Sequence, residues 1–140
     1  MAISAARFLI ILGASIFGVL GGLHLAYTFF SDKFMPRERA VAQAMQGTSP
    51  VISRDLNMWD AWIGFNASHS LGAILLAAVY LLLAIQHMEL LAQSRSFILL
   101  AVGASASYLW LAHAYWFRIP FIGIALASAC FVAAAILLSV

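Results

Sequence analysis

Three histidines lie inside long uncharged segments of the chain, and they are its best candidates for chemistry. His24, His69 and His113 each occupy a different segment, and most of the residues around them are apolar. Neutral imidazole is the commonest metal ligand in proteins, and it also acts as an acid or a base near neutral pH. The three residues are therefore candidate ligands for a metal ion or a haem iron, and candidate acid–base groups.

Further polar and aromatic residues accompany these histidines. Asn66 precedes His69 by three residues, so the two side chains share a face if the segment is helical. A mostly apolar cavity with a few convergent polar groups is the usual form of a small-ligand site. We therefore predict a ligand site centred on His24, Asn66 and His69. The rest of its wall is predicted to come from His113, Tyr108, Trp62, Tyr27 and Ser70.

The elements that must position these residues are four segments without Asp, Glu, Lys or Arg. Each is long enough to cross a bilayer core, which takes about 20 apolar residues in a helix. The mean hydropathy of +1.02 and the charged fraction of 9% exclude an ordinary soluble domain. The four uncharged segments are residues 8–31, 61–88, 96–117 and 119–140.

This pattern predicts an all-α, polytopic membrane protein. We expect residues 1–140 to form a single transmembrane domain, a four-helix bundle. The first uncharged segment exceeds the apolar core of a signal peptide, about 7–15 residues, so we interpret it as a retained helix. The expected helices cover residues 5–30, 58–87, 95–117 and 119–139.

The segment between residues 31 and 57 is the only long connection. Pro36 at a helix start and Gly47 just past a helix end predict a short helix over residues 36–46. Its apolar face and its arginines are typical of an amphipathic helix that lies on the bilayer surface. Asn57 is a predicted N-cap for the second span, and Asp60 in the first turn suits a helix N-terminus.

The basic residues predict the orientation and the class of partner. Lys33, Arg37, Arg39, Arg54 and Arg118 fall on the side of the 31–57 connection, and only Arg7 and Arg95 fall on the other side. The positive-inside rule then places the connection in the cytoplasm and both termini outside. We expect membrane lipids as partners, together with a second copy of the chain or a larger membrane complex. We expect no nucleic acid.

Helix geometry places the three histidines in one half of the bilayer. At about 1.5 Å of rise per residue, His24 lies roughly 9 Å, His113 roughly 6 Å and His69 roughly 15 Å below the connection-side surface. A metal or haem site shared by all three has to bridge these unequal depths. No carboxylate stands beside any of them in the sequence.

Two other interpretations stay open. The polar groups can line a cavity for an amphiphile such as a lipid, a quinone or a sterol-like molecule, with a histidine available as acid or base. Alternatively they bond only to one another, His24 with Asn66 and His69 with Tyr108, at about 0.6 kcal/mol per bond. The protein would then be a structural accessory subunit of a larger membrane complex.

The second uncharged segment, residues 61–88, contains a pattern that is similar to one in a group of known sequences. The pattern W-x-G-F-N-x-S-H-S-x-G, residues 62–72, resembles the second helix of an uncharacterised group of small bacterial four-helix membrane proteins. His24, which follows Gly21 and Gly22 closely, adds to it. The resemblance implies the four-helix architecture and a bacterial inner membrane, and it implies no particular activity. The sequence thus predicts binding, with or without transformation, of a small amphiphile or of a metal or haem cofactor.

Overall fold

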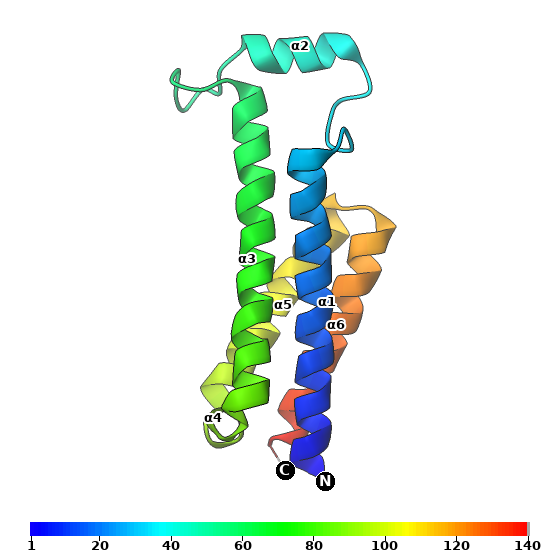
Figure 1. Cartoon of the computed structure of the whole chain (residues 1–140), viewed down its shortest axis with the longest axis vertical. Coiled ribbons are helices and arrows are strands. Elements are labelled where there is room, and N and C mark those ends of the chain that lie inside the picture. Colours follow the sequence, from blue (N-terminus) through cyan, green and yellow to red (C-terminus); the bar gives the residue numbers. More distant parts are fainter. Residues whose placement is uncertain (140) are drawn as a thin grey trace. The chain divides into compact units, whose positions relative to one another are not determined.

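The computed structural model describes residues 1–139, and these residues are helical with no strand among them. Four of the helices, α1, α3, α5 and α6, are long and apolar enough to cross a membrane, which confirms the predicted spans (Figure 1). The chain is therefore a helical membrane protein. The helices are α1 (Ala2–Phe30), α2 (Arg39–Gly47), α3 (Met58–Gln86), α4 (Met88–Gln93), α5 (Arg95–Tyr115) and α6 (Arg118–Leu137).

Local sequence explains where the long helices begin. The side chain of Asn57 caps α3, because its Oδ1 accepts a hydrogen bond from the backbone N–H of Asp60 at 2.8 Å. Pro120 is the third residue of α6. Its missing N–H is harmless there, because the first backbone N–H groups of a helix have no intrahelical acceptor. Only Trp116 and Phe117 separate α5 from α6, so these two helices form a tight hairpin.

The chain divides into two compact units. Unit 1 comprises Met1–Leu20 and Ala73–Val140, and unit 2 comprises Gly21–Gly72. Helices α1 and α3 contribute to both units, whereas α5 and α6 belong to unit 1 and α2 belongs to unit 2.

Alanines and aromatic rings form the core of unit 1. The rings of Phe17 and Phe131 are fully buried, with centroids 6.2 Å apart. A Cβ atom on Gly13 of α1 would lie 3.1 Å from the carbonyl oxygen of Ala127 in α6, so this approach requires a residue without a side chain. Small residues permit such close contact between helices in membranes, where van der Waals packing supplies much of the attraction.

The connection between α3 and α5 differs from the prediction. The expected helices left residues 88–94 without a helix, but the structure contains helix α4 there. Met88 and Leu91, one helical turn apart, are 2% and 1% exposed in the core of unit 1. Isolated helices of this length are unstable, so the burial of these two side chains is what stabilises α4.

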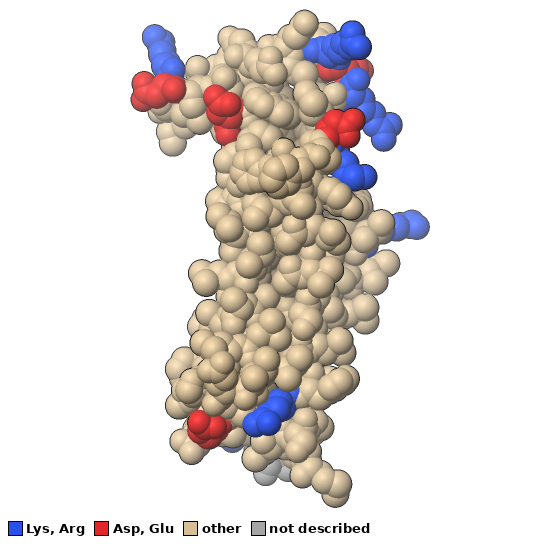
Figure 2. Space-filling model, in the orientation of Figure 1, with Lys and Arg blue, Asp and Glu red and all other residues tan. Residues whose placement is uncertain are grey.

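The helix in the long connection begins later than predicted. Pro36 lies outside α2, because the carbonyl of Glu38 accepts the first helical N–H groups, those of Val41 and Ala42 at 3.1 and 3.3 Å. None of the residues of α2 is buried. The charged side chains of unit 2 that Figure 2 shows gather around α2 and its flanking turns.

Candidate functional site

A hydrogen bond between two spans lies at the centre of the predicted site. His24 Nε2 in α1 is 3.0 Å from Asn66 Oδ1 in α3. The amide nitrogen of Asn66 donates to the carbonyl oxygen of Trp62 at 2.8 Å. Because a carbonyl only accepts, this second bond fixes the amide so that its oxygen faces His24. His24 Nε2 therefore carries the hydrogen and donates it, and Nδ1 of the neutral ring is an acceptor.

Two hydroxyl groups satisfy the backbone around this bond. Thr28 donates to the carbonyl of His24, and Ser70 donates to the carbonyl of Asn66, each at 2.8 Å. Thr28, Asn66 and Ser70 are all buried, with exposures of 6%, 7% and 0%. Hydroxyl bonds to the carbonyl four residues earlier are a usual way to satisfy Ser and Thr inside a helix. The cluster thus holds its polar groups without exposing them to lipid.

A second imidazole lies beside the first. The ring centroids of His24 and His69 are 5.4 Å apart, with the ring planes at 63°. Phe34, in the segment after α1, also contacts His24, with centroids 4.5 Å apart. Both histidines are half-buried, so the pair is partly accessible from outside unit 2.

Aromatic residues form a rim near these two rings. Trp62 Nε1 donates to the carbonyl oxygen of Phe34 at 3.1 Å, which ties the start of α3 to the segment after α1. The side chains of Trp62 and Tyr27 are 39% and 38% exposed. Lys33 Nζ lies 4.9 Å from the centroid of the Tyr27 ring, within the range of a cation–π contact. Rings with one polar end and a nearby cation are typical of the headgroup level of a membrane.

Two of the predicted wall residues belong to unit 1. Tyr108 packs edge-to-face on Phe17, with centroids 5.3 Å apart, and also contacts Trp116. His113 is exposed in the last turn of α5, and its ring lies 5.8 Å from that of Phe121. The structure brings His24, Trp62, Asn66, His69 and Ser70 together in unit 2, whereas Tyr108 and His113 belong to unit 1.

The predicted three-histidine metal site is not assembled in the described part of the chain. No group of three or more His, Cys, Asp or Glu side chains among residues 1–139 could hold a metal ion. Within unit 2 one nitrogen of His24 is already bonded to Asn66. Nδ1 of His24 remains as an acceptor for a ligand there.

The two hollows that the structure shows best lie in unit 1. The first, about 380 Å³, lies between α5 and α6 and includes Arg95, and the second, about 510 Å³, lies along α5 at Ser107 and Trp110. Neither is lined by His24, Asn66 or His69.

Sequence reasoning missed one contributor to the site, Phe34. Its ring lies on His24 and its carbonyl accepts from Trp62, but a phenylalanine in a loop gives no signal of either contact. Comparison with protein-family models, curated proteins and solved structures finds no match for this chain. Its function is therefore argued from the geometry of the site.

Proposed function

We propose that this membrane protein binds the polar head of a small amphiphile at the His24–His69 pair. One observation carries the proposal: two imidazole rings lie inside candidate spans with their centroids 5.4 Å apart, and a hydrogen bond to Asn66 holds the ring of His24 in place. Ionisable side chains within a membrane span are costly, and an interhelical hydrogen bond in that setting contributes only about 0.6 kcal/mol.

The orientation of His24 defines what the head must offer. Its Nδ1 atom accepts a hydrogen bond, so the bound group needs a hydroxyl or N–H donor. His69 supplies a second imidazole ring beside that of His24. Asn66 keeps His24 from rotating, which lowers the entropy lost on binding. The exposed rings of Tyr27 and Trp62 would cover the head, and the apolar tail would extend along the spans.

The finer architecture is part of the same proposal. We place α1, α3, α5 and α6 as a four-helix transmembrane bundle in a bacterial inner membrane, with α2 as an interfacial helix. The count of basic residues supports a cytoplasmic location for the 31–57 connection. In this arrangement the histidine pair faces the half of the bilayer next to the connection.

A second candidate function is that of an accessory subunit in a larger membrane complex. One observation supports it: Gly64 and Ser68, one turn apart on α3, are exposed, and a Cβ on Gly64 would meet no atom within 4 Å. Small residues on an outward face suit close packing against a partner helix. A partner protein that copurifies in a fixed ratio and is lost in a Gly64→Leu variant would favour this function.

The proposal is tested on protein purified in mild detergent. The measurements are an optical spectrum, metal analysis and mass spectrometry of the extracted lipids, on the wild type and on His69→Ala. We expect one retained amphiphile per chain, and its loss in His69→Ala. His87→Ala is the matched control, because His87 lies in the turn before α4 with its side chain 50% exposed.

The fold of each variant is checked by size-exclusion chromatography and thermal unfolding. His69→Gln keeps a polar group and serves where His69→Ala does not fold. Equal retention of the amphiphile by the wild type and by a folded His69 variant would refute the proposed site. A Soret band in the spectrum or a stoichiometric metal would show that the site binds a cofactor and not an amphiphile.

A further inference from the structure

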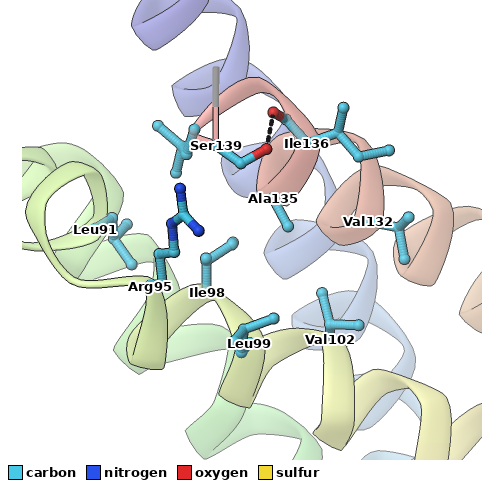
Figure 3. A pocket seen from close by; sticks show the side chains of 10 residues that line it. Leu91, Arg95, Ile98, Leu99, Val102, Val132, Ala135, Ile136 and Ser139 are labelled. Carbon is cyan, nitrogen blue, oxygen red and sulfur yellow. Dashed lines mark hydrogen bonds between the residues drawn. The ribbon is translucent and has the colours of Figure 1, made fainter.

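A hollow of about 380 Å³ lies between α5 and α6 in unit 1, far in sequence from the histidine pair. Its volume is within the usual range for small-ligand sites, about 300–1,000 Å³. Its walls are aliphatic except for the side chains of Arg95 and Ser139 (Figure 3). The aliphatic lining comes from Leu91, Ile98, Leu99, Val102, Val132, Ala135, Ile136 and Leu138.

Arg95 is the only charged group in this lining. It is the first residue of α5, and Figure 3 shows its side chain reaching across the hollow toward Ser139 at the end of α6. Among residues 1–139 the one ion pair joins His87 to Glu89, and no hydrogen bond to the Arg95 guanidinium is formed. The hydroxyl of Ser139 is already used, because it donates to the carbonyl of Ile136 at 2.7 Å. The five guanidinium donors therefore have no acceptor in the described protein.

The chemistry of this hollow specifies its occupant. A guanidinium is a planar fork that binds a phosphate or a carboxylate through two parallel hydrogen bonds. It stands at the end of a candidate span, at the level where lipid headgroups lie. Behind it, Ile98, Leu99 and Val102 follow α5 away from this end, and they offer an apolar wall that an acyl chain can cover. A free anion would leave that wall unused.

We infer that this hollow is a binding site for an anionic phospholipid. The phosphate accepts from the guanidinium of Arg95, and one acyl chain lies between α5 and α6 against Val102 and Val132. The competing explanation is that Arg95 only interacts with the negative end of α6, as cations near a helix C-terminus do. That explanation predicts an effect on stability and none on lipid binding.

The experiment is a titration of delipidated protein in mixed micelles, with bound lipid measured by native mass spectrometry. The probes are phosphatidylglycerol, phosphatidylcholine and inorganic phosphate. We expect phosphatidylglycerol to bind one per chain and more tightly than phosphatidylcholine, and inorganic phosphate not to compete. Arg95→Gln should weaken phosphatidylglycerol binding by about tenfold, the effect of one lost charge-assisted pair. Arg118→Gln is the matched control, because Arg118 is also the exposed first residue of its helix.

The apolar part of the site is tested separately. Ala135→Phe should fill the hollow and reduce phosphatidylglycerol binding while Arg95 stays in place, and Val132→Phe, at a 43% exposed position, serves if the first variant does not fold. Wild-type affinity in Arg95→Gln or in both filled variants would overturn the inference. So would competition by inorganic phosphate, or equal affinity for phosphatidylcholine. The histidine variants should leave this titration unchanged, so the two proposals fail independently.

Discussion

Unit 1 buries mostly apolar side chains, together with those of Ser105 and Ser128, whereas the side chains that unit 2 buries are polar. The buried hydrophobic residues, from Ala6 to Ala134, all belong to unit 1. In unit 2 the buried side chains are those of Thr28, Asn66 and Ser70, and each makes a hydrogen bond. Helices of similar length and hydropathy thus carry two kinds of interior. The first depends mainly on the packing of apolar side chains and the second on hydrogen bonds.

The largest effect should come from opening the core of unit 1. Phe131 is fully buried and contacts the rings of Phe17 and Tyr80. Phe131→Ala should lower the free energy of unfolding by about 3–5 kcal/mol, because it removes contacts and leaves a cavity. Reversible unfolding in mixed micelles measures the change. The neighbouring Val132→Ala, at a position 43% exposed, is the control and should have a much smaller effect.

A smaller effect should come from overfilling the same core. Gly13→Val places atoms against the carbonyl of Ala127 and the side chain of Cys130, so it should destabilise the protein by about 1–3 kcal/mol. Gly64→Val is the matched change in unit 2, where a Cβ meets nothing within 4 Å. The same unfolding assay should show little effect there. If the two valine variants lowered the free energy of unfolding equally, the claim that Gly13 is tightly packed and Gly64 is not would be wrong.

The smallest effect on stability should come from the polar interior of unit 2. Asn66→Leu has nearly the same size but leaves the Nε2–H group of His24 without its acceptor. We expect a loss of about 1 kcal/mol. In a double-mutant cycle with His24→Leu, the coupling energy should be about 0.6 kcal/mol. A coupling near zero would mean that the two side chains do not depend on each other in the membrane.

The sequence predicted the four spans because absence of charge over about 20 residues is a strong and local signal. One of the interpretations that the sequence left open paired His24 with Asn66, because helix rise gives depth from residue number alone, and the structure contains this bond. The sequence could not predict which way each helix is rotated. On α6, for example, Ala129 is exposed whereas Ala127, Phe131 and Ala134 are buried, although the segment is apolar on every side.

The rest of the candidate site depends on contacts that residue types do not reveal. Helix α4 forms because Met88 and Leu91 are buried in the core. The local sequence pattern gives only a weak indication of that burial. The link from Trp62 to the carbonyl of Phe34 joins residues 28 positions apart through a backbone atom. The hollow at Arg95 exists because of the space left between α5 and α6, and that space follows from packing in three dimensions.

The most direct test of the central claim is nitrogen NMR of the histidine rings in micelles, before and after delipidation. For His24 we expect the Nε2–H tautomer in both states. Removal of the bound amphiphile should shift Nδ1 of His24 and the ring nitrogens of His69, while those of His87 stay unchanged. If the His24 and His69 signals were identical before and after complete delipidation, the pair would bind no amphiphile and its role would be only to join α1 and α3.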